Sequence, residues 1–79
     1  ELTASRVNWI SGDTPAAPVH CAAKTRYSQT EEPCTAYPLP NNCLRVVFDR
    51  PQRAITAGQA VVLYDGDVVL GGGTIEESE

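Results

Sequence analysis

Three cysteines and one histidine are the side chains of this 79-residue chain that are best suited to bind zinc. Cys21, Cys34 and Cys43 form no Cys-x-x-Cys pair, and His20 lies directly before Cys21. A structural zinc site needs four ligands at paired short spacings, and an odd number of cysteines leaves one thiol outside any set of disulfides. The pattern therefore favours reduced cysteines that serve as small apolar residues.

Catalytic groups are not recognisable in the sequence. His20 is the only histidine and no nucleophile elbow accompanies it, so a Ser-His-Asp site is not expected. Lys24 is the only lysine, and Gly71–Gly73 is followed by neither Lys-Ser nor Lys-Thr, which argues against a phosphate-binding loop. The pair Glu31-Glu32 is typical of a solvated surface. We expect no catalytic residue, cofactor site or metal site within these residues.

A small basic and aromatic set remains. Its members are Lys24, Arg26 and Tyr27, with Arg45, Arg50 and Arg53 elsewhere in the chain. Arginine and lysine neutralise phosphates, and tyrosine stacks on bases. The net charge of −4 opposes tight independent binding of a polyanion. Composition alone thus favours ordinary surface charge, and an RNA-binding role requires a local patch assisted by another part of the molecule.

Period-two alternation is the main signal for secondary structure. In residues 19–28 it places Cys21, Ala23 and Thr25 on one face, and Lys24 and Arg26 on the other. Short strands are predicted at 19–28, 34–37, 43–49, 53–55, 60–64, 67–70 and 74–75. No segment shows helical periodicity over three turns. The chain is predicted to be all-β, a small antiparallel barrel of six or seven strands with a C-terminal hairpin.

The turns and ends of this single domain, residues 1–79, also follow from sequence. Asp65-Gly66 suits a type I′ turn between the hairpin arms, and Gly71–Gly73 predicts a bulge or sharp bend where the barrel closes. Residues 1–18 form a lead-in segment whose apolar cluster, Val7–Ile10, packs on the barrel, and residues 76–79 form an acidic tail. The absence of methionine indicates a domain of a larger protein. Nothing resembles a signal peptide or a membrane span.

Five pieces of the chain carry a family resemblance when taken in order. They are Val7–Gly12, Ala23–Gln29, Pro33–Thr35, Val47–Gln59 and Tyr64–Ile75. With these, nearly the whole sequence resembles the C-terminal β-barrel domain of the tRNA-specific 2-thiouridylases. Each piece is a weak signal by itself, whereas the ordered set with matching spacing is specific.

The resemblance implies a role inside a larger cytoplasmic enzyme. In that family an N-terminal domain uses ATP, with magnesium, to adenylate the 2-oxygen of the wobble uridine, and two cysteines of that domain deliver persulfide sulfur. The product is 2-thiouridine in the tRNAs for Lys, Glu and Gln. The implied partners are tRNA, the barrel's own catalytic domain and a sulfur-relay donor protein. Cys21, Cys34 and Cys43 match barrel positions and receive no role in sulfur transfer.

Carried over residue by residue, the tRNA contacts of the family fall on Arg26, Tyr27 and Gln59. Lys24 and Arg53 join them from the basic set. Adjacent residues of a regular strand point to opposite faces, so Arg26 and Tyr27 can share a ligand only near a strand end or a bulge, or through a backbone or edge contact.

Three positions depart from the family pattern. Ser28 stands where a second basic residue is common, and this removes one phosphate partner. Arg50 replaces an acid and adds a charge nearby. Ala57 replaces proline and loosens the turn before Gln59.

Two alternatives to RNA docking remain open. The barrel could serve only to pack on its catalytic domain, as accessory barrels do in translation factors or aminomethyltransferases, with Trp9 and Val47 at that interface. Trp9 equally suits a buried hydrophobic plug. A barrel that binds folate or another metabolite would need a convergent polar pocket, for which the sequence has no signature. If Lys24, Arg26 and Arg53 lie on one face of the barrel, that basic patch favours RNA binding over a packing role alone.

Overall fold

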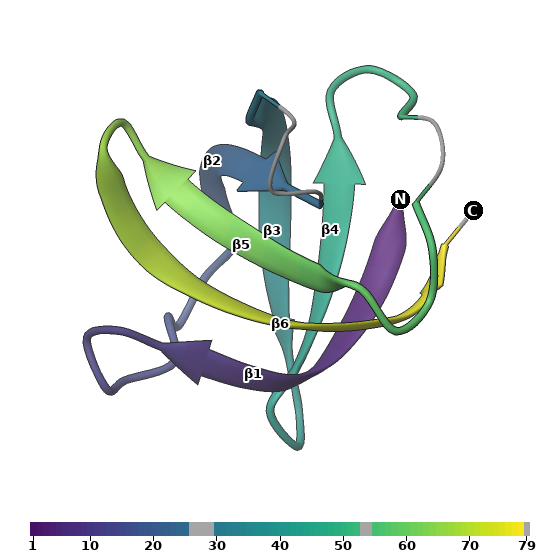
Figure 1. The fold of residues 1–79 in the computed structure, drawn as a ribbon. Helices are drawn as coiled ribbons and strands as arrows, with labels where there is room; N and C mark the ends of the chain where they lie inside the picture. Colours follow the sequence, from purple (N-terminus) through teal and green to yellow (C-terminus); the bar gives the residue numbers. More distant parts are fainter. Residues whose placement is uncertain (26–29, 53–54, 79) are drawn as a thin grey trace.

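A computed structural model describes residues 1–25, 30–52 and 55–78 of the chain and confirms the all-β fold (Figure 1). The described residues contain six strands: β1 (Leu2–Trp9), β2 (Val19–Lys24), β3 (Glu32–Leu39), β4 (Cys43–Phe48), β5 (Ala60–Asp65) and β6 (Val68–Ser78). Of the short strand expected at 53–55, Arg53 and Ala54 lie outside the described residues, and Ile55 is not in a strand. No helix long and apolar enough to cross a membrane occurs in the described part.

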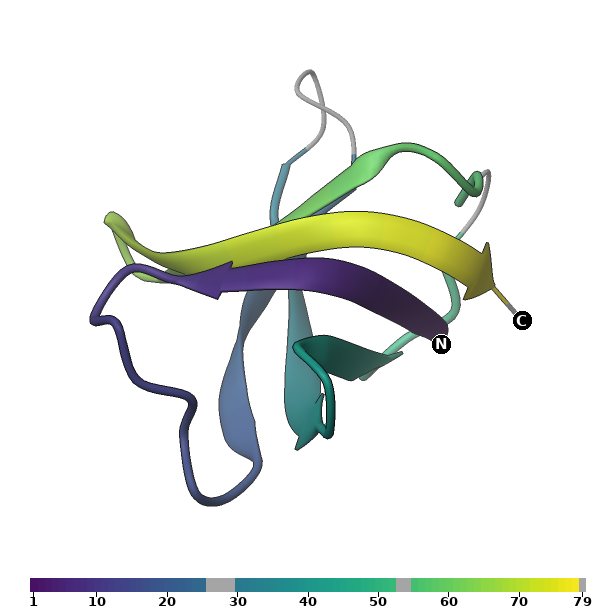
Figure 2. The same cartoon turned by 90° about the horizontal axis from the view of Figure 1, so that it is seen from below.

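The strands close into an antiparallel barrel in the order β1-β4-β3-β2-β5-β6, and β6 pairs back onto β1. Figure 2 shows the long β6 and β1 side by side across one face, with β2 and β3 crossing at a steep angle behind them. Closure gives every strand a neighbour on each side, so none of the six described strands is an edge strand along its whole length.

Alternation within each strand builds the core as the sequence predicts. Cys21, Ala23 and Thr25 point inward from β2 and the residue after it, while Leu44 and Val46 point inward from β4. The buried apolar residues are Leu2, Ala4, Val7, Trp9, Cys21, Ala23, Cys34, Ala36, Leu44, Val46, Val61, Leu63 and Ile75. Phe48, which follows Leu44 and Val46 at the same two-residue spacing along β4, packs against this cluster.

The first half of the expected lead-in segment is strand β1, which the sequence did not reveal. Leu2 and Ala4 point into the core, but after Arg6 the inward positions become Val7 and Trp9. Arg6 has a positive φ of 53°, and the pairing of β1 with β6 shifts register at this point. Such a bulge inserts one residue and reverses the faces, so the alternation that identifies a strand is broken in its middle.

The β5–β6 turn also differs from the expected one. Asp65 pairs with Val68, so the two loop residues are Gly66 and Asp67 rather than Asp65 and Gly66. Gly66 has a φ of 61°, and Asp67 is not among the residues with positive φ. Positive φ at the first loop residue alone is the pattern of a type II′ turn, whereas type I′ needs it at both.

The glycine triplet of β6 lies where the barrel closes. A Cβ atom at Gly71 would fall on the carbonyl oxygen of Asn8 in β1, and one at Gly73 would lie 2.8 Å from that of Ser5. A Cβ at Gly72 would lie 2.7 Å from the carbonyl oxygen of Val61 in β5. The expected bulge comes directly before the triplet, since Gly71 pairs with Leu63 but Val69 pairs with Tyr64. The glycines themselves let β6 approach both neighbours closely.

Gly71→Ala tests this constraint. We expect it to lower the free energy of unfolding by about 2–3 kcal/mol, because backbone atoms of β1 must move to admit the methyl group. Gly12→Ala is the matched control, since Gly12 has a φ of 89° and no atom within 4 Å of its Cβ position. Gly12→Ala should lower the free energy of unfolding by about 1 kcal/mol, because alanine is disfavoured at a positive φ. Urea unfolding measures both, and equal losses would contradict close approach as the reason for glycine at position 71.

Candidate functional site

Lys24, the last residue of β2, and Gln59, directly before β5, lie toward the same end of the barrel. Lys24 is the last residue of β2 and pairs with Val62 of β5. Gln59 directly precedes β5, three residues before Val62, a separation of about 10 Å along an extended chain. Both side chains are half-buried. The structure therefore places two of the five expected RNA contacts at the same end of β5.

The other three expected contacts lie outside the described residues. Arg26 and Tyr27 follow the buried Thr25, and Arg53 lies between β4 and β5. Whether Lys24, Arg26 and Arg53 form one basic face therefore stays a prediction. Ser28 also lies outside the described residues.

Gln59 is held in place by its backbone. Its carbonyl oxygen accepts a hydrogen bond of 2.8 Å from the Ile75 amide, and the Gly58 amide donates one of the same length to the Ile75 carbonyl. Gly58 has a φ of 91°, which only glycine adopts readily. The Oε1 atom of Gln59 is buried and has no hydrogen-bond partner among the described residues. A buried acceptor without a donor is costly, so the donor for this oxygen is expected outside the described residues.

Two of the described arginines are engaged by carboxylates of the barrel itself. Arg45 donates from Nε and Nη2 to the two carboxylate oxygens of Glu1, at 2.7 and 3.0 Å, and its guanidinium lies 5.6 Å from the Tyr37 ring centroid. These hydrogen bonds hold the pKa of the Glu1 carboxyl below its usual value. The Nη2 atom of Arg50 lies 3.4 Å from the Oε1 atom of Glu32.

Lys24 differs from these arginines. No ion pair joins it to any described residue, because the pairs in that part of the chain are His20–Asp49, Arg45–Glu1 and Arg50–Glu32. Its ammonium group is therefore not engaged in an ion pair with the described residues, although Ala23 beside it pairs with Glu32.

Cys21 and Cys34 form a buried pair that the sequence did not indicate. They are directly opposite each other on β2 and β3, and their sulfur atoms are 3.8 Å apart. The hydrogen bond from Cys34 lowers the pKa of the Cys21 thiol, while the same bond and burial raise the pKa of Cys34. The register of β2 against β3 brings them together, and that register depends on a loop whose path the sequence does not specify.

The described residues contain no group of three or more His, Cys, Asp or Glu that could hold a metal ion.

Of the two residues considered for a packing interface, Trp9 is only 9% exposed and belongs to the core, and Val47 is half-buried. The expectation of Trp9 as a hydrophobic plug agrees with this position.

Comparison with known proteins assigns the barrel to a family. The profile of the aminomethyltransferase beta-barrel domain matches residues 1–75. The chain therefore belongs to this family of β-barrel domains.

Individual relatives show which enzymes contain a region similar to this chain. The chain is 54% identical over 77 residues to the tRNA-specific 2-thiouridylase MnmA of Trichormus variabilis, covering 98% of the chain and 22% of the relative. The corresponding enzyme of Symbiobacterium thermophilum is 57% identical over 77 residues, covering 98% of the chain and 20% of the relative. The resemblance drawn from the sequence is thus confirmed, and the chain spans about a fifth of the length of these relatives.

The buried cysteine pair yields a test of the core in solution. Cys43 is half-buried, whereas Cys21 and Cys34 are buried. An aromatic disulfide reagent should modify Cys43 quickly, and the other two at least about a hundredfold more slowly, because they react only when the barrel opens. Absorbance of the released thiolate measures both phases. Cys43→Ser should abolish the fast phase, and three thiols that react at one rate in the folded protein would contradict the burial of Cys21 and Cys34.

Proposed function

We propose that this barrel is the tRNA-docking domain of a tRNA-uridine 2-sulfurtransferase. The observation that carries the proposal is the identity of about one half, across 98% of the chain, to enzymes named tRNA-specific 2-thiouridylases. The lack of a catalytic motif in the chain is consistent with a domain that binds substrate while another domain performs the chemistry.

In this proposal the rest of the enzyme supplies the reaction. A separate N-terminal domain binds ATP and magnesium, activates the 2-oxygen of the wobble uridine in the tRNAs for Lys, Glu and Gln, and receives sulfur from a relay protein. The barrel is not itself catalytic. Its contribution is to hold the tRNA against that domain, in the cytoplasm.

The end of the barrel that carries Lys24 and Gln59 is the proposed contact. Lys24 meets a phosphate, and the amide oxygen of Gln59 accepts a hydrogen bond from a base amino group or a 2′-hydroxyl. Arg26 and Arg53 add phosphate contacts, and Tyr27 stacks on a base. The first two roles are supported by the absence of an ion pair between Lys24 and any described carboxylate and by the unsatisfied Gln59 oxygen.

The electrostatics fit an auxiliary contact rather than independent binding. A chain with a net charge of −4 and a few phosphate contacts binds RNA weakly and loses affinity steeply with salt. Tethered to a second RNA-binding surface, the same contacts act at high effective concentration. One positively charged end of the barrel is then sufficient for an auxiliary contact with tRNA.

Substitutions in the full-length enzyme test the proposal. Lys24→Ala and Arg26→Ala should each raise the KM for tRNA, leave ATP binding unchanged, and reduce the slope of log affinity against log salt by about 0.7–0.9, the value for one lost phosphate contact. Filter binding across a salt series measures the slope.

Arg45→Ala is the matched control, because Arg45 is bound to Glu1 on the same barrel. It should leave the affinity and the salt slope unchanged. Unaltered tRNA affinity in both the Lys24 and the Arg26 variants would overturn the docking role.

A further inference from the structure

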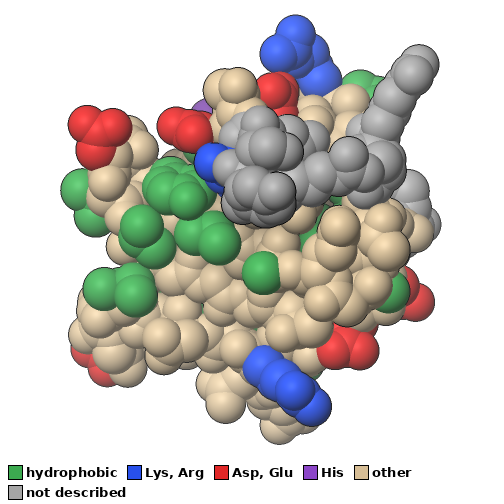
Figure 3. All heavy atoms as spheres, in the orientation of Figure 1, with side chains coloured by type: hydrophobic (Ala, Val, Ile, Leu, Met, Phe, Trp, Pro, Cys, Tyr) green, Lys and Arg blue, Asp and Glu red, His purple; other side chains and the backbone are tan. Residues whose placement is uncertain are grey.

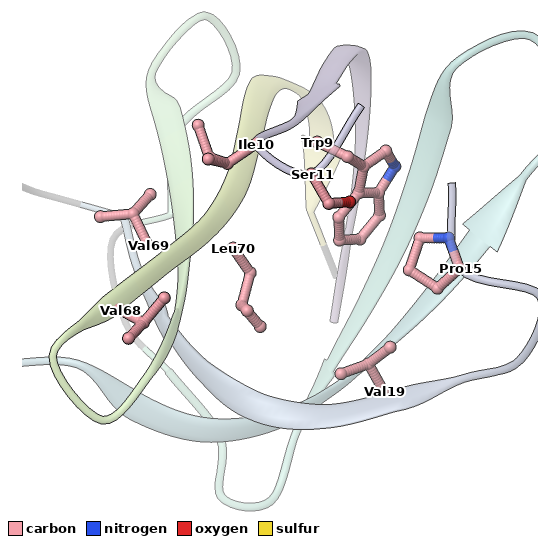
Figure 4. Close-up of a pocket in the computed structure, with 8 residues that line it drawn as sticks. All are labelled: Trp9, Ile10, Ser11, Pro15, Val19, Val68, Val69 and Leu70. Atoms are coloured by element: carbon pink, nitrogen blue, oxygen red, sulfur yellow. The ribbon is translucent and has the colours of Figure 1, made fainter. Parts of the chain in front are cut away.

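An apolar groove lies at the end of the barrel opposite Lys24. Its volume is about 330 Å³, and it is lined by Trp9, Ile10, Ser11, Pro15, Val19, Val68, Val69 and Leu70 (Figure 4). Figure 4 shows these side chains converging from the end of β1, the loop after it, the start of β2 and the start of β6. Val19 and Lys24 are the two ends of β2, which separates the groove from the candidate RNA contact by about 16 Å.

Large apolar side chains are exposed at this groove. Ile10 is 63% exposed, Val68 62% and Val69 40%. A second, shallower groove beside Gly71–Gly73 shares Ile10 and Val69 with it, so the apolar surface continues along β6. Figure 3 shows hydrophobic side chains gathered over the β5–β6 hairpin and the end of β1. Contiguous apolar surface of this kind marks an interaction site.

The charges around the groove restrict what can occupy it. None of the eight lining residues is charged, and the segments that supply them carry Asp13, Asp65 and Asp67, all exposed. Acidic side chains border the hydrophobic ones at the hairpin in Figure 3. Phosphates of RNA or of an anionic membrane would be repelled, and so would the same acidic groove of a second copy. A polar metabolite would find Ser11 as the only polar side chain in the lining.

We propose that the groove docks another domain of the same polypeptide, through apolar side chains flanked by lysine or arginine. The inference rests on the proposed function, in which the barrel is one part of a longer enzyme. The chain spans 20–22% of its relatives' length, which leaves about four fifths of each relative to provide such a surface. Because the groove and the Lys24 end lie at opposite ends of β2, the barrel can hold its own enzyme and tRNA at the same time.

Val69→Asp in the full-length enzyme tests this docking. A carboxylate in an apolar interface must be desolvated without a partner, so the barrel should detach for a larger fraction of the time. We expect protease cleavage between the barrel and the remainder to accelerate about tenfold, with a larger radius of gyration by small-angle X-ray scattering. Leu39→Asp is the matched control, because Leu39 is 37% exposed and lies outside the groove. It should change neither measurement.

Other outcomes would overturn the proposal. Unchanged cleavage and scattering for Val69→Asp would show that the groove docks no domain. A wild-type dimer that Val69→Asp converts to a monomer would assign the groove to a second copy. Lower tRNA affinity without a change in scattering would assign it to RNA. The tRNA-docking role is tested separately by the tRNA affinity of Lys24→Ala and Arg26→Ala. These substitutions leave the groove unchanged, so the two proposals can fail independently.

Discussion

Closure of the barrel depends on how closely β6 approaches its two neighbours. It is the strand that pairs with β5 on one side and β1 on the other. Carbonyl oxygens of both neighbours occupy the space where side chains of residues 71–73 would begin. Side chains there would push β6 outward and open the seam between the first and last strands. Without that seam, the sheet would keep two unpaired edges and Leu2 and Ile75 would lose their burial.

The same closure positions the candidate site and shapes the opposite surface. Beyond the glycines, Ile75 of β6 forms the two backbone hydrogen bonds that hold Gly58 and Gln59. Before them, the irregular pairing near Leu70 turns the hairpin so that Val68 and Val69 face outward beside Ile10. The glycines add no side chains of their own, so the outer surface of β6 remains open and apolar. One strand therefore links the Gln59 end to the groove end.

Sequence patterns predicted those parts of the fold that local alternation determines. The faces of β2 and β4 and the location of the hairpin follow from residues two apart, whereas Gln59 comes from the family resemblance alone and its role stays a prediction. What sequence could not predict depends on geometry that no local pattern records. The bulge at Arg6 reverses the faces of β1 in mid-strand, which hid that strand. The pairing of Cys21 with Cys34 depends on cross-strand register. The groove combines residues 9–19 with residues 68–70, two segments distant in sequence, neither of which is unusual by itself.

The distribution of charge explains how an acidic domain can serve an RNA-modifying enzyme. Arg45 and Arg50 are engaged by Glu1 and Glu32, so they add little positive potential to the faces on which they lie. Asp13, Asp65 and Asp67 lie near the apolar groove, whereas Lys24 lies at the other end of β2, beside the pairing of Ala23 with Glu32. Glu32 is engaged by Arg50, so Lys24 can offer a local positive charge to a phosphate despite the net charge of −4. If the groove is bound to a basic surface of the same polypeptide, its aspartates are neutralised there. About 16 Å of β2 separate the groove from Lys24, roughly twice the Debye length at physiological salt, so the two contacts act independently and the barrel can make both without any change in its shape.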